Sequence, residues 1–94
     1  MGARKRTLAW IGSSRKDLLA LSIDLRRFFG HALDCARRGE PHETTRMMKG
    51  FDGNVWQIVK TERDTTYRTV YAVQSNDIVQ VLYCSCRKNK RPRP

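Results

Sequence analysis

The sequence predicts an α+β domain in which two amino-terminal helices pack on an antiparallel sheet of about four strands. Two patterns support this prediction. Apolar residues recur at steps of three and four between Ser22 and Arg38, as in an amphipathic helix. Tyrosine, threonine and valine dominate Thr65 to Val73, as in a strand, and strand patterns flank this segment on both sides. The chain order is therefore a strand, two helices and a meander of at least three strands.

The amino-terminal part of the chain contains one strand and both helices. Residues 7–11 form a short apolar strand, and Ser13 and Ser14 are both positioned to cap a first helix over residues 15–21. Ser22 is positioned to cap the second helix. Gly39 ends that helix, because glycine suits the left-handed conformation that commonly follows a helix.

The remaining strands follow a polar connector over residues 40–45. They cover residues 55–60, 65–73 and 78–84. Both faces of the 65–73 strand are largely apolar, which predicts a central strand covered on both sides. Arg68 shares a face with Val70 and Ala72. A half-buried guanidinium group needs a partner, and an anionic ligand is one candidate.

The composition bounds the chain to one domain and favours a polyanionic partner. The 94 residues carry a net charge of +10, and eight of the nineteen basic residues lie in two arms, residues 1–6 and 87–94, without any acidic residue. Nucleic acid fits this layout better than a membrane, since no long apolar run is present. The alternative is that the arms are solvated and serve only solubility.

Cysteine and histidine offer little for catalysis or metal binding. Cys35, Cys84 and Cys86 follow no secretory signal, which predicts reduced thiols in the cytosol that pack as small hydrophobic residues. No zinc-site spacing, nucleotide-binding loop or catalytic triad motif occurs, so no cofactor is expected. His31 and His42 are expected to be packed or surface residues.

Basic, amide and aromatic side chains on or near the predicted sheet remain as candidates. They are Lys49, Trp56, Gln57, Arg68, Tyr83, Arg87 and Lys88, with Lys90 and Arg91 in the carboxy-terminal arm. Such a set can bind phosphates, stack bases and stabilise a pentavalent phosphorane. An RNA 2′-hydroxyl supplies its own nucleophile, so cleavage would need no metal. From the residues alone, RNA binding and RNA cleavage are not separated.

Five segments, in this order, resemble the phage-derived, HigB-like branch of the RelE/ParE toxin superfamily over roughly residues 7 to 90. They are Leu8-x-Trp10-x-Gly12-Ser13-Ser14-x-x-Asp17-Leu18, Arg26-x-x-x-Gly30-x-x-Leu33, Met48-Lys49-Gly50-Phe51-x-Gly53-x-Val55, Tyr67-Arg68-x-Val70-Tyr71 and Val81-Leu82. The resemblance implies a single RelE-like toxin domain over residues 1–94 and a cytoplasmic location. It also implies a helix-turn-helix antitoxin as partner, cleavage of mRNA in the ribosomal A site, and neither a membrane nor a small-molecule cofactor.

The resemblance also assigns roles to individual residues. Arg68 matches the sheet arginine that contacts the scissile phosphate in RelE-like enzymes. Lys88 matches a second basic catalytic position, with Arg87 beside it, and Lys49 matches a phosphate contact.

The chain departs from the family pattern at three positions. Gln57 stands where a glutamate is common, Tyr83 stands where a histidine is common, and Ser85 stands where a phenylalanine is common. Tyr83 would replace the histidine as a proton donor, but a phenol is a poor base at neutral pH. Two rival interpretations therefore stay open, a ParE-like gyrase inhibitor and a catalytically weak RNA-binding relic.

Overall fold

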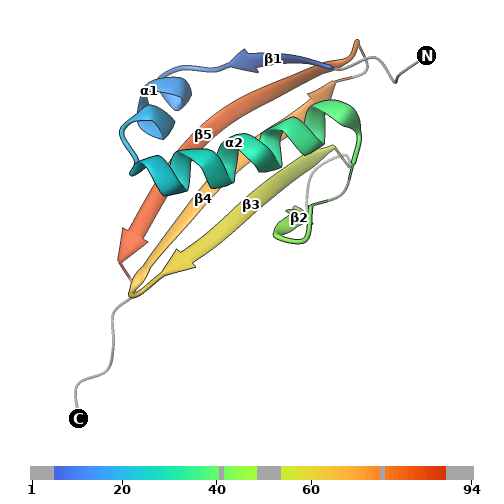
Figure 1. The fold of residues 1–94 in the computed structure, drawn as a ribbon. Coiled ribbons are helices and arrows are strands. Elements are labelled where there is room, and N and C mark those ends of the chain that lie inside the picture. Colours follow the sequence, from blue (N-terminus) through green and yellow to red (C-terminus); the bar gives the residue numbers. More distant parts are fainter. Residues whose placement is uncertain (1–5, 41, 49–53, 75, 89–94) are drawn as a thin grey trace.

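The computed structural model describes residues 6–40, 42–48, 54–74 and 76–88, and it consists of one sheet with two helices on one side (Figure 1). Its elements are β1 (Thr7–Trp10), α1 (Ser14–Leu19), α2 (Ile23–Arg38), β2 (Thr45–Met47), β3 (Val55–Glu62), β4 (Thr65–Gln74) and β5 (Ile78–Lys88). None of the helices in these ranges combines the length and the apolar character needed to cross a bilayer.

The sheet has five strands in the order β1-β5-β4-β3-β2. β1 is parallel to β5, and the other neighbours are antiparallel. The prediction of about four antiparallel strands was therefore only approximate. The strand β2 was not predicted: residue 45 was expected to end the polar connector and residues 46–49 to lead into a turn, because three residues are too few to show an alternating pattern. The parallel pairing of β1 with β5 was not predicted, because the amino-acid composition of a short strand does not indicate the direction of its neighbour.

The caps of α2 confirm the predicted ends of this helix. The Ser22 hydroxyl accepts a hydrogen bond from the Leu25 amide at 3.3 Å, and Gly39 takes a left-handed conformation with φ of 72°. Of the two serines predicted to cap α1, Ser13 occupies the N-cap position, and the helix covers Ser14–Leu19 where residues 15–21 were predicted. The Ser13 hydroxyl donates to Asp17 at 2.9 Å, so this serine holds the first-turn carboxylate instead of a backbone amide.

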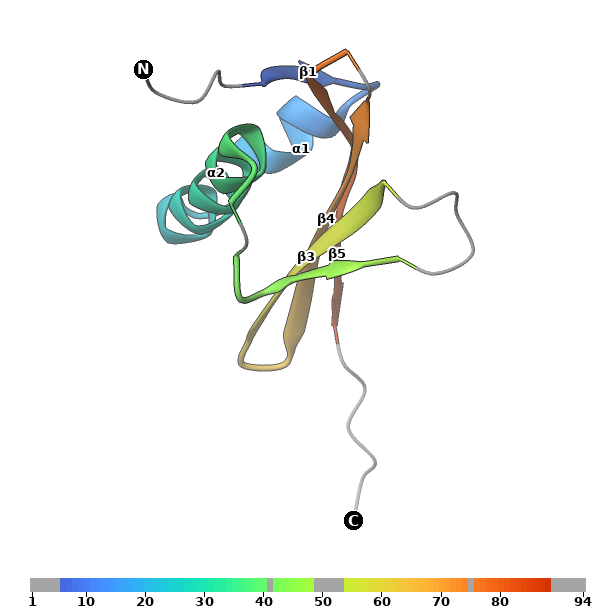
Figure 2. The same cartoon turned by 90° about the vertical axis from the view of Figure 1, so that its right-hand side faces the viewer.

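The core lies between α2 and the sheet. Phe29 and Leu33 of α2 pack against Ile58, Val79 and Val81, and all five side chains are at most 2% exposed. Both helices lie on the same side of the sheet, as the two views in Figures 1 and 2 show. The expectation that the 65–73 strand is covered on both sides was therefore wrong. We call the two sides the helix-covered face and the open face.

One extra residue in β5 changes which side chains reach the open face. Val70 pairs with Tyr83 while Tyr71 pairs with Val81, so Leu82 has no partner on β4, as at a β-bulge. Val79 and Val81 before the bulge point to the helices. Strict alternation from Val81 would put Tyr83 under the helices as well. The bulge instead places Tyr83 on the open face and leaves Cys84 facing α1.

Candidate nucleic-acid interface

Arg68 lies near the centre of the open face. It pairs with Val59 on β3 and with Ser85 on β5, and its side chain is exposed. The neighbouring residue Thr69 points the other way and is fully buried under the helices. The structure thus removes the expectation that Arg68 is half-buried, because nothing among the described residues covers it.

The cross-strand pairings place the other predicted residues relative to Arg68. Gln57 pairs with Val70, and Val70 pairs with Tyr83, so these three share the open face with Arg68. Tyr83 is half-exposed, at 48%. Arg87 pairs with Thr66, two positions along the strand from Arg68 and on the same face. The pairing therefore brings together Arg68, Gln57, Tyr83 and Arg87.

Lys88 lies on the other side of the sheet in the same register. Lys88 pairs with Thr65 of β4. By the alternation of side chains along β4, Thr65 points to the same face as Thr69 and Tyr71, which is the face under the helices. Lys88 is exposed, since it lies at the end of the strand. Trp56, likewise, packs against the helix-side core. Lys49, Lys90 and Arg91 lie outside the described residues.

The open face carries positive charge without compensation. Arg46 of β2 pairs with Gln57, which adds a third arginine to Arg68 and Arg87 on this face. Among the strand positions that the structure describes, none on the open face is an aspartate or glutamate. Within the same ranges, none of the three guanidinium groups has a carboxylate or a hydrogen-bond partner. Three such groups on one uncovered surface favour a polyanionic ligand.

Arg46 was not predicted as a site residue. Residues 46–49 were expected to lead into a turn, so no face was assigned to any of them. The strand Thr45–Met47 is too short to show the alternation that would have assigned Arg46 to a face. Thr45 lines a cavity on the helix side, which confirms that Arg46 points to the open face.

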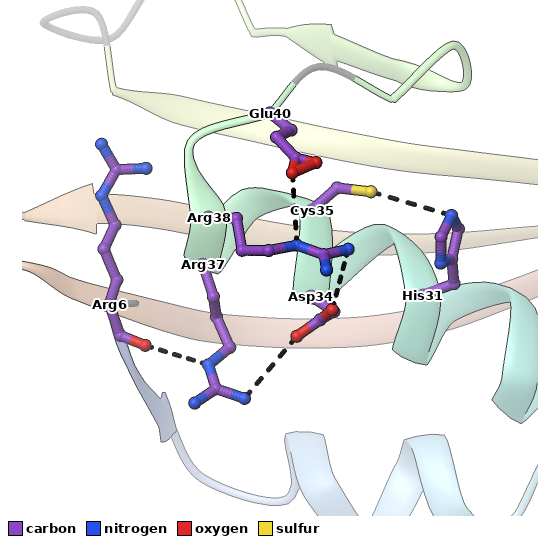
Figure 3. Close-up of polar contacts among 7 residues, drawn as sticks. All are labelled: Arg6, His31, Asp34, Cys35, Arg37, Arg38 and Glu40. Carbon is purple, nitrogen blue, oxygen red and sulfur yellow. Dashed lines mark hydrogen bonds and ion pairs between the residues drawn. The ribbon is translucent and has the colours of Figure 1, made fainter. Parts of the chain in front are cut away.

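Basic residues near the end of α2 are instead used within the scaffold (Figure 3). Arg38 forms an ion pair with Asp34 at 2.9 Å, and the Asp34 charge raises the pKa of the Arg38 guanidinium. The Arg37 Nε group donates to the Arg6 carbonyl at 2.9 Å, while Arg6 Nη1 donates to the Ala36 carbonyl at 2.8 Å. Arg6 was predicted as part of a free basic arm. Here it ties the chain before β1 to the end of α2.

The thiols and imidazoles show no nucleophilic or metal site in the described ranges. Thr69 donates to the Cys84 sulfur at 3.4 Å, and burial raises the pKa of this thiol, which disfavours the nucleophilic thiolate form. The Cys35 sulfur lies 3.8 Å from His31 Nε2, and His42 Nδ1 lies 2.7 Å from the Thr44 hydroxyl. No group of three or more potential ligands in these ranges could hold a metal ion.

A cavity of about 360 Å³ lies on the helix-covered face, between α2 and strands β2 to β4. Its wall includes Tyr71, whose pKa burial raises to about 12, an effect partly offset by the nearby Thr45 side chain and by the Arg6 charge. Because Tyr71 and Thr45 point away from Arg68, the cavity is separate from the open face.

The chain is similar to a known protein family and, in its fold, to solved structures. A family profile described as "Phage derived protein Gp49-like" matches residues 16–93. A free-state structure of a double-arginine mutant of the E. coli toxin RelE has a TM-score of 0.63 and 14% identity, covering 86% of this chain and 82% of that one. The RelBE2 toxin–antitoxin complex of Mycobacterium tuberculosis has a TM-score of 0.58 and 21% identity, covering 88% and 92%. A comparison with curated protein sequences gives no match.

Proposed function

Since the chain belongs to the phage-derived Gp49-like family and has the RelE toxin fold, we propose that it is a toxin that cleaves mRNA on translating ribosomes. The superfamily suggested by the sequence motifs is confirmed by these matches. The single observation that carries the proposed activity is the open face, where Arg68 lies exposed among uncompensated positive charges.

The chemistry suits a guanidinium in this position. In RNA cleavage the 2′-hydroxyl attacks the neighbouring phosphorus, and the 5′-oxygen leaves from the resulting phosphorane. Arg68 would stabilise the additional negative charge of the phosphorane. Arg87 lies on the same face and would add a second cation, whereas Lys88 would have to reach around the edge of the sheet.

Tyr83 and Gln57 would orient the strand. Val70 is the residue of β4 that follows Arg68 on the open face. Tyr83 of β5 pairs with Val70 on one side, and Gln57 of β3 pairs with Val70 on the other side. The phenol donates a proton or a hydrogen bond to the leaving oxygen more readily than it accepts a proton at neutral pH. The 2′-hydroxyl proton would then pass to water or to a ribosomal group.

The partner that controls such a toxin would be an antitoxin encoded beside it. The structural relative from M. tuberculosis was solved as a toxin–antitoxin complex. We expect a helix-turn-helix antitoxin here, and acidic side chains would suit the open face because it carries three arginines.

The direct test is primer extension on cellular mRNA after induction of the wild-type chain and of Arg68→Ala. We expect A-site cuts with wild type and a decrease of about 100-fold or more with Arg68→Ala, the usual loss when one charge-stabilising donor is removed. Arg27→Ala is the matched control, because Arg27 is an exposed arginine of α2 and its loss changes the net charge equally.

The contrary outcomes separate the rival functions. Cuts that persist at the wild-type rate in Arg68→Ala would show that the site is elsewhere. DNA damage signalling without mRNA cuts would identify a gyrase inhibitor. Growth without any toxicity would favour a catalytically weak RNA-binding relic, the interpretation suggested by Tyr83 in place of histidine.

A further inference from the structure

Four residues on four neighbouring strands form one continuous row across the open face. Arg46 of β2 pairs with Gln57, Gln57 with Val70, and Val70 with Tyr83 of β5. We call this set the cross-strand row. With strands about 4.8 Å apart, the row spans about 14 Å from Arg46 to Tyr83, long enough to contact more than one nucleotide.

The middle of the row is buried. Val70 is only 2% exposed and does not belong to the helix-side core. Gln57 is half-buried beside it, while Tyr83 at one end and Arg46 at the other remain exposed. The row thus offers an aromatic ring and a guanidinium at opposite ends of a filled surface.

Arg46 is too far from Arg68 to duplicate its role. The two positions are two strands and two residues apart, which corresponds to about 12 Å between their Cα atoms. Both guanidinium groups lack a carboxylate partner among the described residues, so each has a charge to offer to a phosphate. Two separated cations on one face suit two phosphates of the same strand.

We infer that Arg46 binds an RNA phosphate flanking the scissile one and that the cross-strand row holds the nucleotide between them. Tyr83 stacks on a base, Gln57 contacts a sugar or base edge, and Arg46 fixes the direction of the strand across β2 to β5. Arg46 is accordingly a positioning residue that acts on substrate binding. The inference rests on the proposed function and extends the site to an edge strand that neither the motifs nor the resemblance includes.

The test measures binding and cleavage separately with the full chain. Binding uses a fluorescent 2′-O-methyl RNA oligonucleotide, which has no 2′-hydroxyl to attack, in anisotropy titrations over a salt series. Cleavage uses mRNA on stalled ribosomes, with kcat and KM determined separately. The variants are Arg46→Ala, Arg46→Lys and the matched control Arg27→Ala, each checked for folding by circular dichroism.

We expect Arg46→Ala to weaken oligonucleotide binding about fivefold to tenfold and to reduce the slope of log affinity against log salt by about 0.7, as for one lost phosphate contact to a single strand. KM should rise while kcat stays within about twofold, because Arg46 does not touch the reacting phosphate. Arg46→Lys should restore most of the affinity, since the contact needs only a point charge.

The outcomes distinguish this inference from the proposed function. If Arg68→Ala abolishes cleavage but Arg46→Ala equals Arg27→Ala in affinity, salt slope and KM, the inference is wrong and the function stands. A wild-type chain that does not bind the oligonucleotide also overturns the inference. A wild-type chain that makes no ribosomal cuts, yet binds RNA through Arg46, overturns the proposed cleavage and leaves the binding row.

Discussion

The two faces of the sheet differ although they are built from the same strands. On β4, Thr69 and Tyr71 are buried under the helices, while Arg68 between Tyr67 and Thr69 is exposed. Most of the buried apolar residues belong to the helix-side core, whereas the open-face strand positions that the structure describes include three arginines and no carboxylate. Alternation along a strand therefore separates stability from binding at the level of single residues. Substitutions of buried residues under the helices should affect folding, and substitutions of the exposed arginines on the open face should affect RNA binding.

The largest effect should come from Phe29→Ala on the helix-covered face. Phe29 is fully buried and packs edge to face on Phe28, with ring centroids 5.2 Å apart. Its removal should lower the unfolding free energy by about 3–5 kcal/mol, a large share of the stability of a domain of this size. Urea unfolding followed by the fluorescence of Trp10 and Trp56, which pack against this core, measures the loss.

Arg68→Ala is the comparison for Phe29→Ala. Its unfolding free energy should stay within about 0.5 kcal/mol of wild type, because the side chain is exposed and has no partner in the described part of the chain. A loss of several kcal/mol of unfolding free energy in Arg68→Ala would mean that residues of the open face also contribute to the stability of the fold.

A smaller effect should distinguish Arg87 from Lys88. The register puts Arg87 on the face of Arg68 and Lys88 on the opposite one. We expect Arg87→Ala to lower the rate of mRNA cleavage about tenfold, as for one lost charge-assisted hydrogen bond, and Lys88→Ala to lower it less than threefold. The same ribosomal assay measures both. A larger loss of cleavage in Lys88→Ala than in Arg87→Ala would favour the catalytic role that the resemblance gives to Lys88. It would mean that the end of β5 presents Lys88, and not Arg87, to the RNA in the complex.

The smallest effect concerns the alkaline limit of stability. Burial raises the pKa of Tyr71 from 10.0 to about 12 in the folded chain. Between these values the phenol ionises in the unfolded chain but stays neutral in the folded one. The unfolding free energy should therefore fall as the pH rises through this window. Urea midpoints at several pH values test this, and Tyr71→Phe should show a shallower fall. Identical slopes in both proteins would mean that Tyr71 does not contribute.

Much of the helix-covered face is predictable because its signals are local. The apolar stripe of α2, its cap at Ser22 and its end at Gly39 are each encoded within a few residues. Arg68 is also predictable, since a charge inside an apolar strand draws attention whatever the partners of that strand.

Pairing between strands is the part that the sequence does not reveal. The edge strand β2 is only three residues long, so Arg46 shows no period that would assign it to a face. The relation of Arg87 and Lys88 to Arg68 depends on register across fifteen or more residues. A single extra residue in β5 exchanges their positions.

The unpaired Leu82 has a consequence for the alignment of related chains. Before Leu82, the odd-numbered residues of β5, such as Val79 and Val81, point to the core. After Leu82, the odd-numbered residues, such as Ser85 and Arg87, share the face of Arg68. A relative that lacks this residue would present its carboxy-terminal cations in the opposite phase, even if every other letter were the same. An alignment that slides a gap by one column in β5 would therefore equate a charge on the open face with one that points away from it. For this strand, homologous positions have to be assigned by the pairing with β4, because letter identity alone does not reveal the phase.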